Sequence, residues 1–112
     1  MTTSLTGTAT SIAHVPTAHG SRYLQQLCKH WSHSLKVEFT PEAGTAIFPG
    51  NARGADWPCD ARLNLRAHPA HLECVLEAGV APQRDALKAV VERHLDRFAF
   101  REAPLTFDWR DQ

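Results

Sequence analysis

The fold is decided by residues 59–78, which read CDARLNLRAHPAHLECVLEA. Apolar and polar side chains alternate over residues 59–66 and again over residues 72–78, as in two strands that each bury one face. If the four residues 68–71 form a hairpin loop, counting outward fixes the pairing register. Opposite charges then face each other on one side of the hairpin and apolar residues on the other, in the pairs Arg66 with Glu73, Arg62 with Glu77, Leu65 with Cys74, and Leu63 with Leu76.

Two helices are predicted from apolar residues that recur at helical spacing. The first is capped by Thr17 or Ser21, and the second has Pro82 at or near its first turn, where proline fits. Each helix therefore has one face to bury against a sheet. The apolar stripe of the first helix is Leu24, Leu27, Cys28, Trp31 and Leu35, and that of the second is Leu87, Val90, Val91, His94, Leu95 and Phe98.

Four shorter segments complete the predicted sheet. Residues 35–39 and 45–48 form two strands joined by a turn, and residues 9–15 and 105–109 form the first and last strands. The resulting order is β-α-β-β-β-β-α-β. It predicts an α+β protein, a two-layer sandwich in which an antiparallel β-sheet carries both helices on one face.

Length and composition set limits on the function. A chain of 112 residues is expected to form a single domain, residues 1–112, in which residues 1–8 fray. Lysine plus arginine number 12, as do aspartate plus glutamate, so no basic excess favours nucleic acid as a partner. No apolar run reaches the roughly 18 residues of a membrane span, so no membrane partner is expected. The 3 cysteines, without a CxxC pair, predict reduced thiols in a cytoplasmic protein.

Residues 21–33, SRYLQQLCKHWSH, hold an unusual concentration of chemically capable side chains. His30 and His33 are three positions apart, so on a helix they are neighbours that can share a metal ion. Zinc or non-haem iron needs at least one more protein ligand, which makes this a weak metal site, with solvated helix histidines as the alternative. Cys28 lies on the apolar stripe and is expected to act as a small hydrophobe.

His94 stands in the middle of the apolar stripe of the second helix, where leucine or alanine would serve packing. A buried imidazole needs hydrogen-bond partners to offset the loss of water. One interpretation is a structural histidine bonded to a backbone carbonyl or to Tyr23 or Trp31. The other is a histidine that faces a ligand in a pocket between the helices and the sheet. His68 and His71, beside the hairpin turn, are expected to be solvated.

Two blocks of the chain resemble an uncharacterised bacterial family, domain of unknown function 2218. The first block is residues 21–33 with residues 37–39, and the second is residues 94–102 with the ending Phe107-Asp108-Trp109. The resemblance runs from about residue 13 to residue 109. It implies no established activity, but an association with siderophore-interacting reductases and with iron uptake. The positions that match the family pattern are Cys28, Lys29, His30, Trp31, His33, His94 and Arg97.

Three hypotheses follow. The leading one is a non-enzymatic accessory module, without a cofactor or catalytic residues, that binds a small ligand or a protein partner in iron or siderophore handling. A siderophore-interacting reductase is then the candidate partner. The second hypothesis is a metal- or haem-binding protein that uses the helix histidines, and the third is a small enzyme that uses Cys28 or His94. The predicted ligand-binding residues are Lys29, His30, Trp31, His33, His94 and Arg97.

Overall fold

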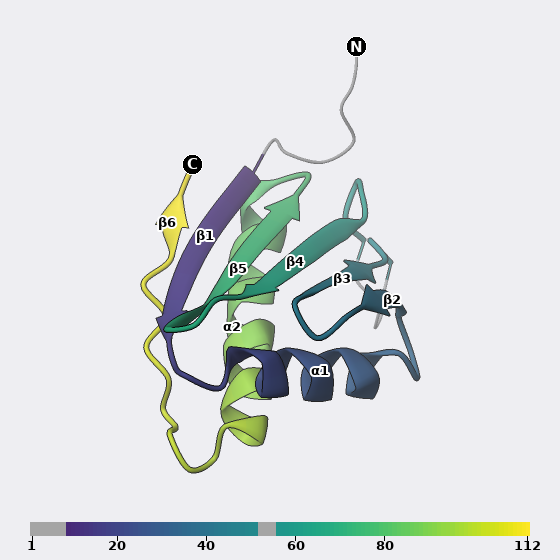
Figure 1. The fold of residues 1–112 in the computed structure, drawn as a ribbon. Helices are drawn as coiled ribbons and strands as arrows, with labels where there is room; N and C mark the ends of the chain where they lie inside the picture. The colour runs from purple at the N-terminus through teal and green to yellow at the C-terminus, as the bar shows by residue number, and fades with distance from the viewer. Residues whose placement is uncertain (1–8, 52–55) are drawn as a thin grey trace.

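An antiparallel sheet and two helices form the part of the chain that the computed structural model describes, residues 9–51 and 56–112 (Figure 1). Within these residues the sheet has six strands in the order β2-β3-β4-β5-β1-β6. The order of elements along the chain confirms the α+β prediction. The elements are β1 (Ala9–Pro16), α1 (Gly20–Trp31), β2 (Lys36–Phe39), β3 (Ala43–Phe48), β4 (Ala61–Ala67), β5 (His71–Ala78), α2 (Ala81–Phe98) and β6 (Arg110–Asp111).

The β4–β5 hairpin has the predicted register. Arg66 pairs with Glu73, and the other three predicted pairs are also present. The predicted pairs of opposite charge lie across from each other, although neither arginine of the hairpin forms an ion pair within the described residues. Glu73 instead lies 2.9 Å from the ring nitrogen of His68, and Glu77 accepts a hydrogen bond from Asn64 at 3.0 Å. The alternation of apolar and polar residues therefore fixes the register without ion pairs.

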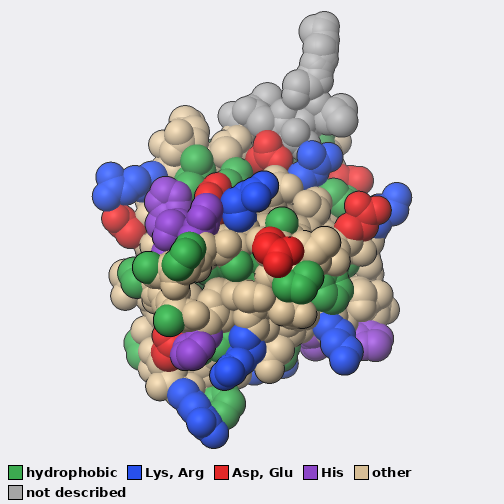
Figure 2. All heavy atoms as spheres, viewed as in Figure 1, with side chains coloured by type: hydrophobic (Ala, Val, Ile, Leu, Met, Phe, Trp, Pro, Cys, Tyr) green, Lys and Arg blue, Asp and Glu red, His purple; other side chains and the backbone are tan. Residues whose placement is uncertain are grey.

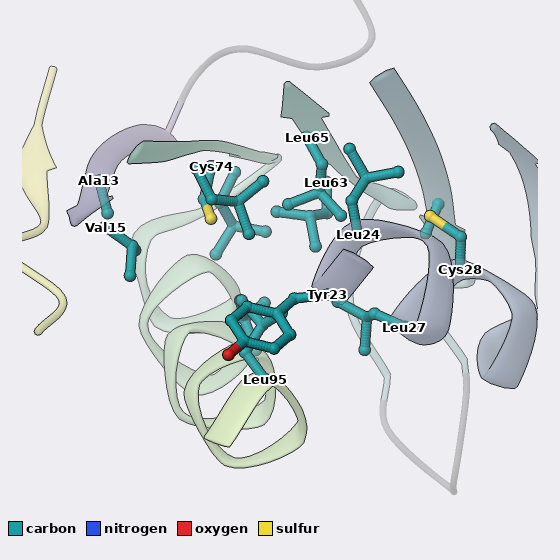
Figure 3. Close-up of a cluster of buried hydrophobic side chains, with 14 of the residues drawn as sticks. Ala13, Val15, Tyr23, Leu24, Leu27, Cys28, Leu63, Leu65, Cys74 and Leu95 are labelled. Carbon is teal, nitrogen blue, oxygen red and sulfur yellow. The ribbon is translucent and has the colours of Figure 1, made fainter. Parts of the chain in front are cut away.

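Both helices pack on the same face of the sheet, as predicted. α1 contacts β2, β3, β4 and β5, and α2 contacts β5 and β1, while the two helices also touch each other. Figure 1 shows α2 behind β4 and β5, with α1 running across it at a steep angle. In Figure 3, labelled side chains from α1 and α2 and from β1, β4 and β5 point into one cluster. Its fully buried members include Leu24, Leu27, Leu63, Leu72, Leu76, Val91 and Leu95. In the described part of the chain, no helix is both long and apolar enough to cross a membrane.

The C-terminal strand differs from the prediction over residues 105–109. Only Arg110 and Asp111 pair with β1, although Leu105 is buried and the apolar residues after it pack on the core in the predicted alternation. The reason lies in α2, whose Asp96 accepts the backbone N–H of Leu105 at 2.9 Å and whose Glu92 accepts the indole N–H of Trp109 at 2.8 Å. These bonds hold the segment beside the helix, and ladder pairing begins only after it.

The start of α1 also differs from the prediction. The helix begins at Gly20, its cap residue is His19, and no side chain caps it. Ser21 is already inside the helix and donates to the carbonyl of Pro41 at 2.6 Å. Thr17 accepts the backbone N–H of His19 at 3.0 Å, in the turn before the helix. Thr17 and Ser21 therefore both stabilise the N-terminal end of α1, although neither is its cap residue.

The close approach of α1 to β3 generates a first prediction. A Cβ atom added at Gly44 would lie 2.7 Å from the sulfur of Cys28 and 3.1 Å from the Cβ of Phe39. The change Gly44→Ala should lower the free energy of unfolding by about 1–3 kcal/mol, because the side chains must shift to make room. Urea denaturation measures the difference.

Two further variants make this test specific. Gly20→Ala places its Cβ no nearer than 3.4 Å to other atoms and puts a better helix former in α1, so it should not destabilise the protein. In a Cys28→Ala background, Gly44→Ala should cost less free energy, because the sulfur is gone. An equal cost in both backgrounds would contradict the steric account.

Candidate functional site

A pocket of about 390 Å³ opens on the helix side of the molecule, beside the C-terminal end of α1. It is bounded by that end of α1 and the turn after it, by the end of β3, by the loop before β4 and by one face of α2. Most of its lining is apolar or aromatic, with a few polar groups among them. The lining residues are His30, Trp31, Ser34, Leu35, Phe48, Pro49, Trp57, Gln83, Leu87, Val90, Arg93 and His94.

Aromatic rings converge on one wall of the pocket. The indole of Trp31 lies edge-on to Phe48 with 5.0 Å between ring centres, and 5.2 Å from the ring of His94. The ring of His30 lies 5.8 Å from that of His94 and also 5.8 Å from that of Phe98. These spacings are those of favourable aromatic contacts. The end of α1 and the middle of α2 thus meet through an indole and two imidazoles.

His94 has one ring nitrogen committed to its own helix. Its Nδ1 lies 2.7 Å from the carbonyl oxygen of Val90, which can only accept, so Nδ1 carries the proton. Burial lowers the pKa of His94, the bond to Val90 opposes this, and His30, Arg93 and nearby Arg97 lower the pKa further. The neutral ring then keeps an unprotonated Nε2 that can accept a hydrogen bond. A carbonyl partner was one of the predicted interpretations. Tyr23, another predicted partner, donates to Glu102 instead.

Gln83 and Trp57 belong to the pocket although sequence reasoning missed them. Gln83 is 1% exposed, and its amide donates to the carbonyl of Cys59 at 2.9 Å and accepts the N–H of Gly79 at 3.2 Å. It therefore ties the first turn of α2 to the loop before β4. Nothing in its sequence surroundings marks Gln83 as buried. Trp57 did carry a signal, since a large aromatic in a loop rich in Gly, Pro and Asp has no apolar stripe to join.

The predicted ligand-binding residues separate into two groups. His30, Trp31 and His94 line the pocket together. Lys29, His33 and Arg97 are exposed and do not line it, so their part in binding stays a prediction. The arginine that does line the pocket is Arg93.

His30 and His33 do not lie on one helix, as the predicted weak metal site assumed, and metal binding by the two stays a prediction. α1 ends at Trp31, so His33 lies in the turn that follows it. The turn forms because the backbone N–H groups of residues 32 and 35 bond back to the carbonyls of Cys28 and Trp31. Among the described residues, no group of three metal-ligating side chains includes either histidine.

Comparison with known proteins agrees with the resemblance. The family described as "Uncharacterized protein conserved in bacteria (DUF2218)" matches residues 12–110. The chain belongs to this family. It is also similar to a solved protein, described as "NMR structure of PA4090 from Pseudomonas aeruginosa", with 33% identity over 90% of this chain and 94% of that one and a TM-score of 0.70. No curated protein matches the chain. The two descriptions that match name no activity, ligand or partner.

Two of the three cysteines of this DUF2218 protein are buried thiols with a raised pKa. Cys28 is fully buried against β3, and burial raises its pKa to about 11. Cys74 lies in the core of the sheet, where burial raises its pKa to about 12. Both therefore remain protonated at neutral pH, and the thiolate is the reactive form. Cys59 is partly exposed.

Alkylation of the native protein tests this arrangement. Iodoacetamide followed by peptide mass spectrometry should modify Cys59 well before Cys28 and Cys74, because both of those thiols are buried and protonated. In urea all three should react, which serves as the control. Rapid modification of Cys28 in the folded protein would contradict the packing role and favour the enzyme hypothesis.

The partial burial of His94 predicts that the stability of this DUF2218 protein depends on pH. Its pKa in the folded state lies below the ordinary 6.5, so the unfolded chain takes up a proton first as the pH falls. The contribution of His94 to the free energy of unfolding is therefore largest above pH 6.5. It declines as the pH drops from 6.5 through the folded-state pKa of His94.

NMR titration of the His94 ring protons, in buffer and in urea, measures the two pKa values. We expect the lower value in buffer. A folded-state pKa equal to or above the value in urea would show that the ring is not desolvated.

Proposed function

We propose that this DUF2218 protein is a non-enzymatic binding module, and that its pocket between α1 and α2 takes a small aromatic molecule with hydroxyl and acidic groups. The observation that supports this most is the convergence of Trp31, His30 and His94 on one pocket of about 390 Å³. This volume lies within the range of roughly 300–1,000 Å³ that small-molecule sites occupy. A mostly apolar lining with a few polar groups is also typical of such sites.

The lining favours particular ligand chemistry. Trp31, Phe48 and Trp57 offer faces and edges on which a flat ring can pack. The unprotonated Nε2 of a neutral His94 would accept a hydrogen bond from a phenolic hydroxyl. The guanidinium of Arg93 would pair with a carboxylate or a deprotonated phenol. Hydroxybenzoates and catechols combine these groups.

This chemistry fits the association with iron and siderophore handling that the family resemblance implies, because catechols are iron chelators. A siderophore-interacting reductase is then a reasonable protein partner. A bacterial cytoplasmic location accords with three cysteines that are all free thiols. Protonated, buried Cys28 favours binding over catalysis.

Titration with 2,3-dihydroxybenzoate, with and without ferric iron, tests the proposal. Tryptophan fluorescence and ¹H–¹⁵N spectra should report binding at one site, with a dissociation constant of about 0.1 mM for so small a ligand. His94→Ala and Arg93→Ala should each weaken binding about tenfold, because one polar contact is lost in each case.

His19→Ala and Arg22→Ala are matched controls, since both residues are exposed and lie outside the pocket. They should bind as the unchanged protein does. No saturable signal from Trp31 or its neighbours, or an equal loss in the controls, would overturn the proposal. Variants of Lys29, His33 and Arg97 tell whether these exposed residues also contribute.

A further inference from the structure

The face of the sheet that carries no helix presents a second group of histidines. Along β1 and β5 every other side chain points away from the helices, and His14, His71 and Glu73 occupy such positions. The antiparallel register places His14 directly opposite Glu73. His71 and Glu73, two residues apart on β5, share this face. Figure 2, which views this face, shows histidine side chains gathered with an acidic one beside them over the β1–β5 side.

The ligating atoms of these three residues already lie close together. One ring nitrogen from each histidine and one oxygen of Glu73 are all within 4.8 Å of one another. A zinc ion bonded at about 2.0–2.2 Å to each ligand needs them about 3.3 Å apart in a tetrahedral arrangement. Side-chain rotations that move the ligating atoms by about 1 Å would bring them to bonding distance of an ion. The strand pairing would keep the backbone in place.

His68 adds support from the hairpin turn. It was predicted to be solvated, but its ring stacks on that of His71 at 4.3 Å and its Nε2 lies 2.9 Å from an oxygen of Glu73. His71, also predicted to be solvated, is only partly exposed. A histidine that holds a ligating carboxylate in this way is a typical outer partner of a metal site.

We propose that His14, His71 and Glu73 bind a first-row divalent cation such as Zn²⁺ on the open face of the sheet, with His68 orienting the carboxylate. Two imidazoles and one carboxylate are a zinc-binding set that leaves a position open for water or a further ligand. Magnesium and calcium prefer oxygen ligands throughout and should bind poorly. The site lies on the opposite face from the pocket between the helices, so it does not rest on the function proposed there.

Calorimetric titration of Zn²⁺ into protein without a histidine tag tests the inference. We expect one equivalent to bind, and His14→Ala and His71→Ala each to weaken binding at least tenfold, because one of three ligands is lost. Zn²⁺ should also shift the ring resonances of both histidines in the NMR spectrum, and Mg²⁺ should not. His19→Ala, a histidine variant away from the group, should bind zinc as the unchanged protein does.

These variants alter side chains on the surface of the sheet, and an unchanged urea midpoint shows that each remains folded. No binding at 100 µM Zn²⁺, or binding that both His14→Ala and His71→Ala leave intact, would overturn the inference. A loss on His30→Ala instead would place the ion at α1 and overturn it as well. Titration of 2,3-dihydroxybenzoate into the same variants is a separate readout, since the pocket does not include these residues.

Discussion

The rest of the structure depends on the pairing register of β5 with its neighbours β4 and β1. A slip of one residue would turn every side chain of β5 to the other face of the sheet. In the observed register Leu72, Cys74 and Leu76 are fully buried beneath the helices, while His71 and Glu73 point away from them. The buried face on which both helices pack and the histidine group on the open face therefore both follow from this register.

The pocket exists because α2 packs on the sheet by only part of its apolar stripe. Val91 and Leu95 are fully buried, whereas Val90 and His94 are partly exposed and turn toward the end of α1. Trp31 contacts His94 there, because α1 runs at a steep angle to α2.

A polar cluster joins the segment after α2 to α1 and to the turn between β1 and α1. Glu102 accepts hydrogen bonds from the hydroxyl groups of Tyr23 and Thr17. The bond from Tyr23 has the largest effect and, with that from Thr17, holds the pKa of Glu102 below its usual range. Burial acts in the opposite direction. Glu102, just past the end of α2, thus links the C-terminal segment to α1 and to the turn before it.

Local features of the sequence predict most of the fold but only part of the sites. The β4–β5 register followed from counting, because a short loop joins the two strands. The buried faces of both helices followed from spacing, as did the unusual position of His94. Arg93 and Gln83 were missed because lining the pocket depends on how α2 crosses α1, which no local pattern encodes. The group around His14 was missed because β1 and β5 are far apart in the chain, and no turn fixes their register.

The central claim is that one register gives the sheet its two different faces, and a side-chain NOE spectrum of the labelled protein tests it most directly. Ring-to-ring contacts should appear between His14 and His71, whose ring centres lie 5.0 Å apart on the open face. The same spectrum should show contacts between Trp31 and His94, 5.2 Å apart on the helix side. Contacts from the His14 ring to buried Leu72 or Cys74 in place of His71, with none between Trp31 and His94, would contradict it.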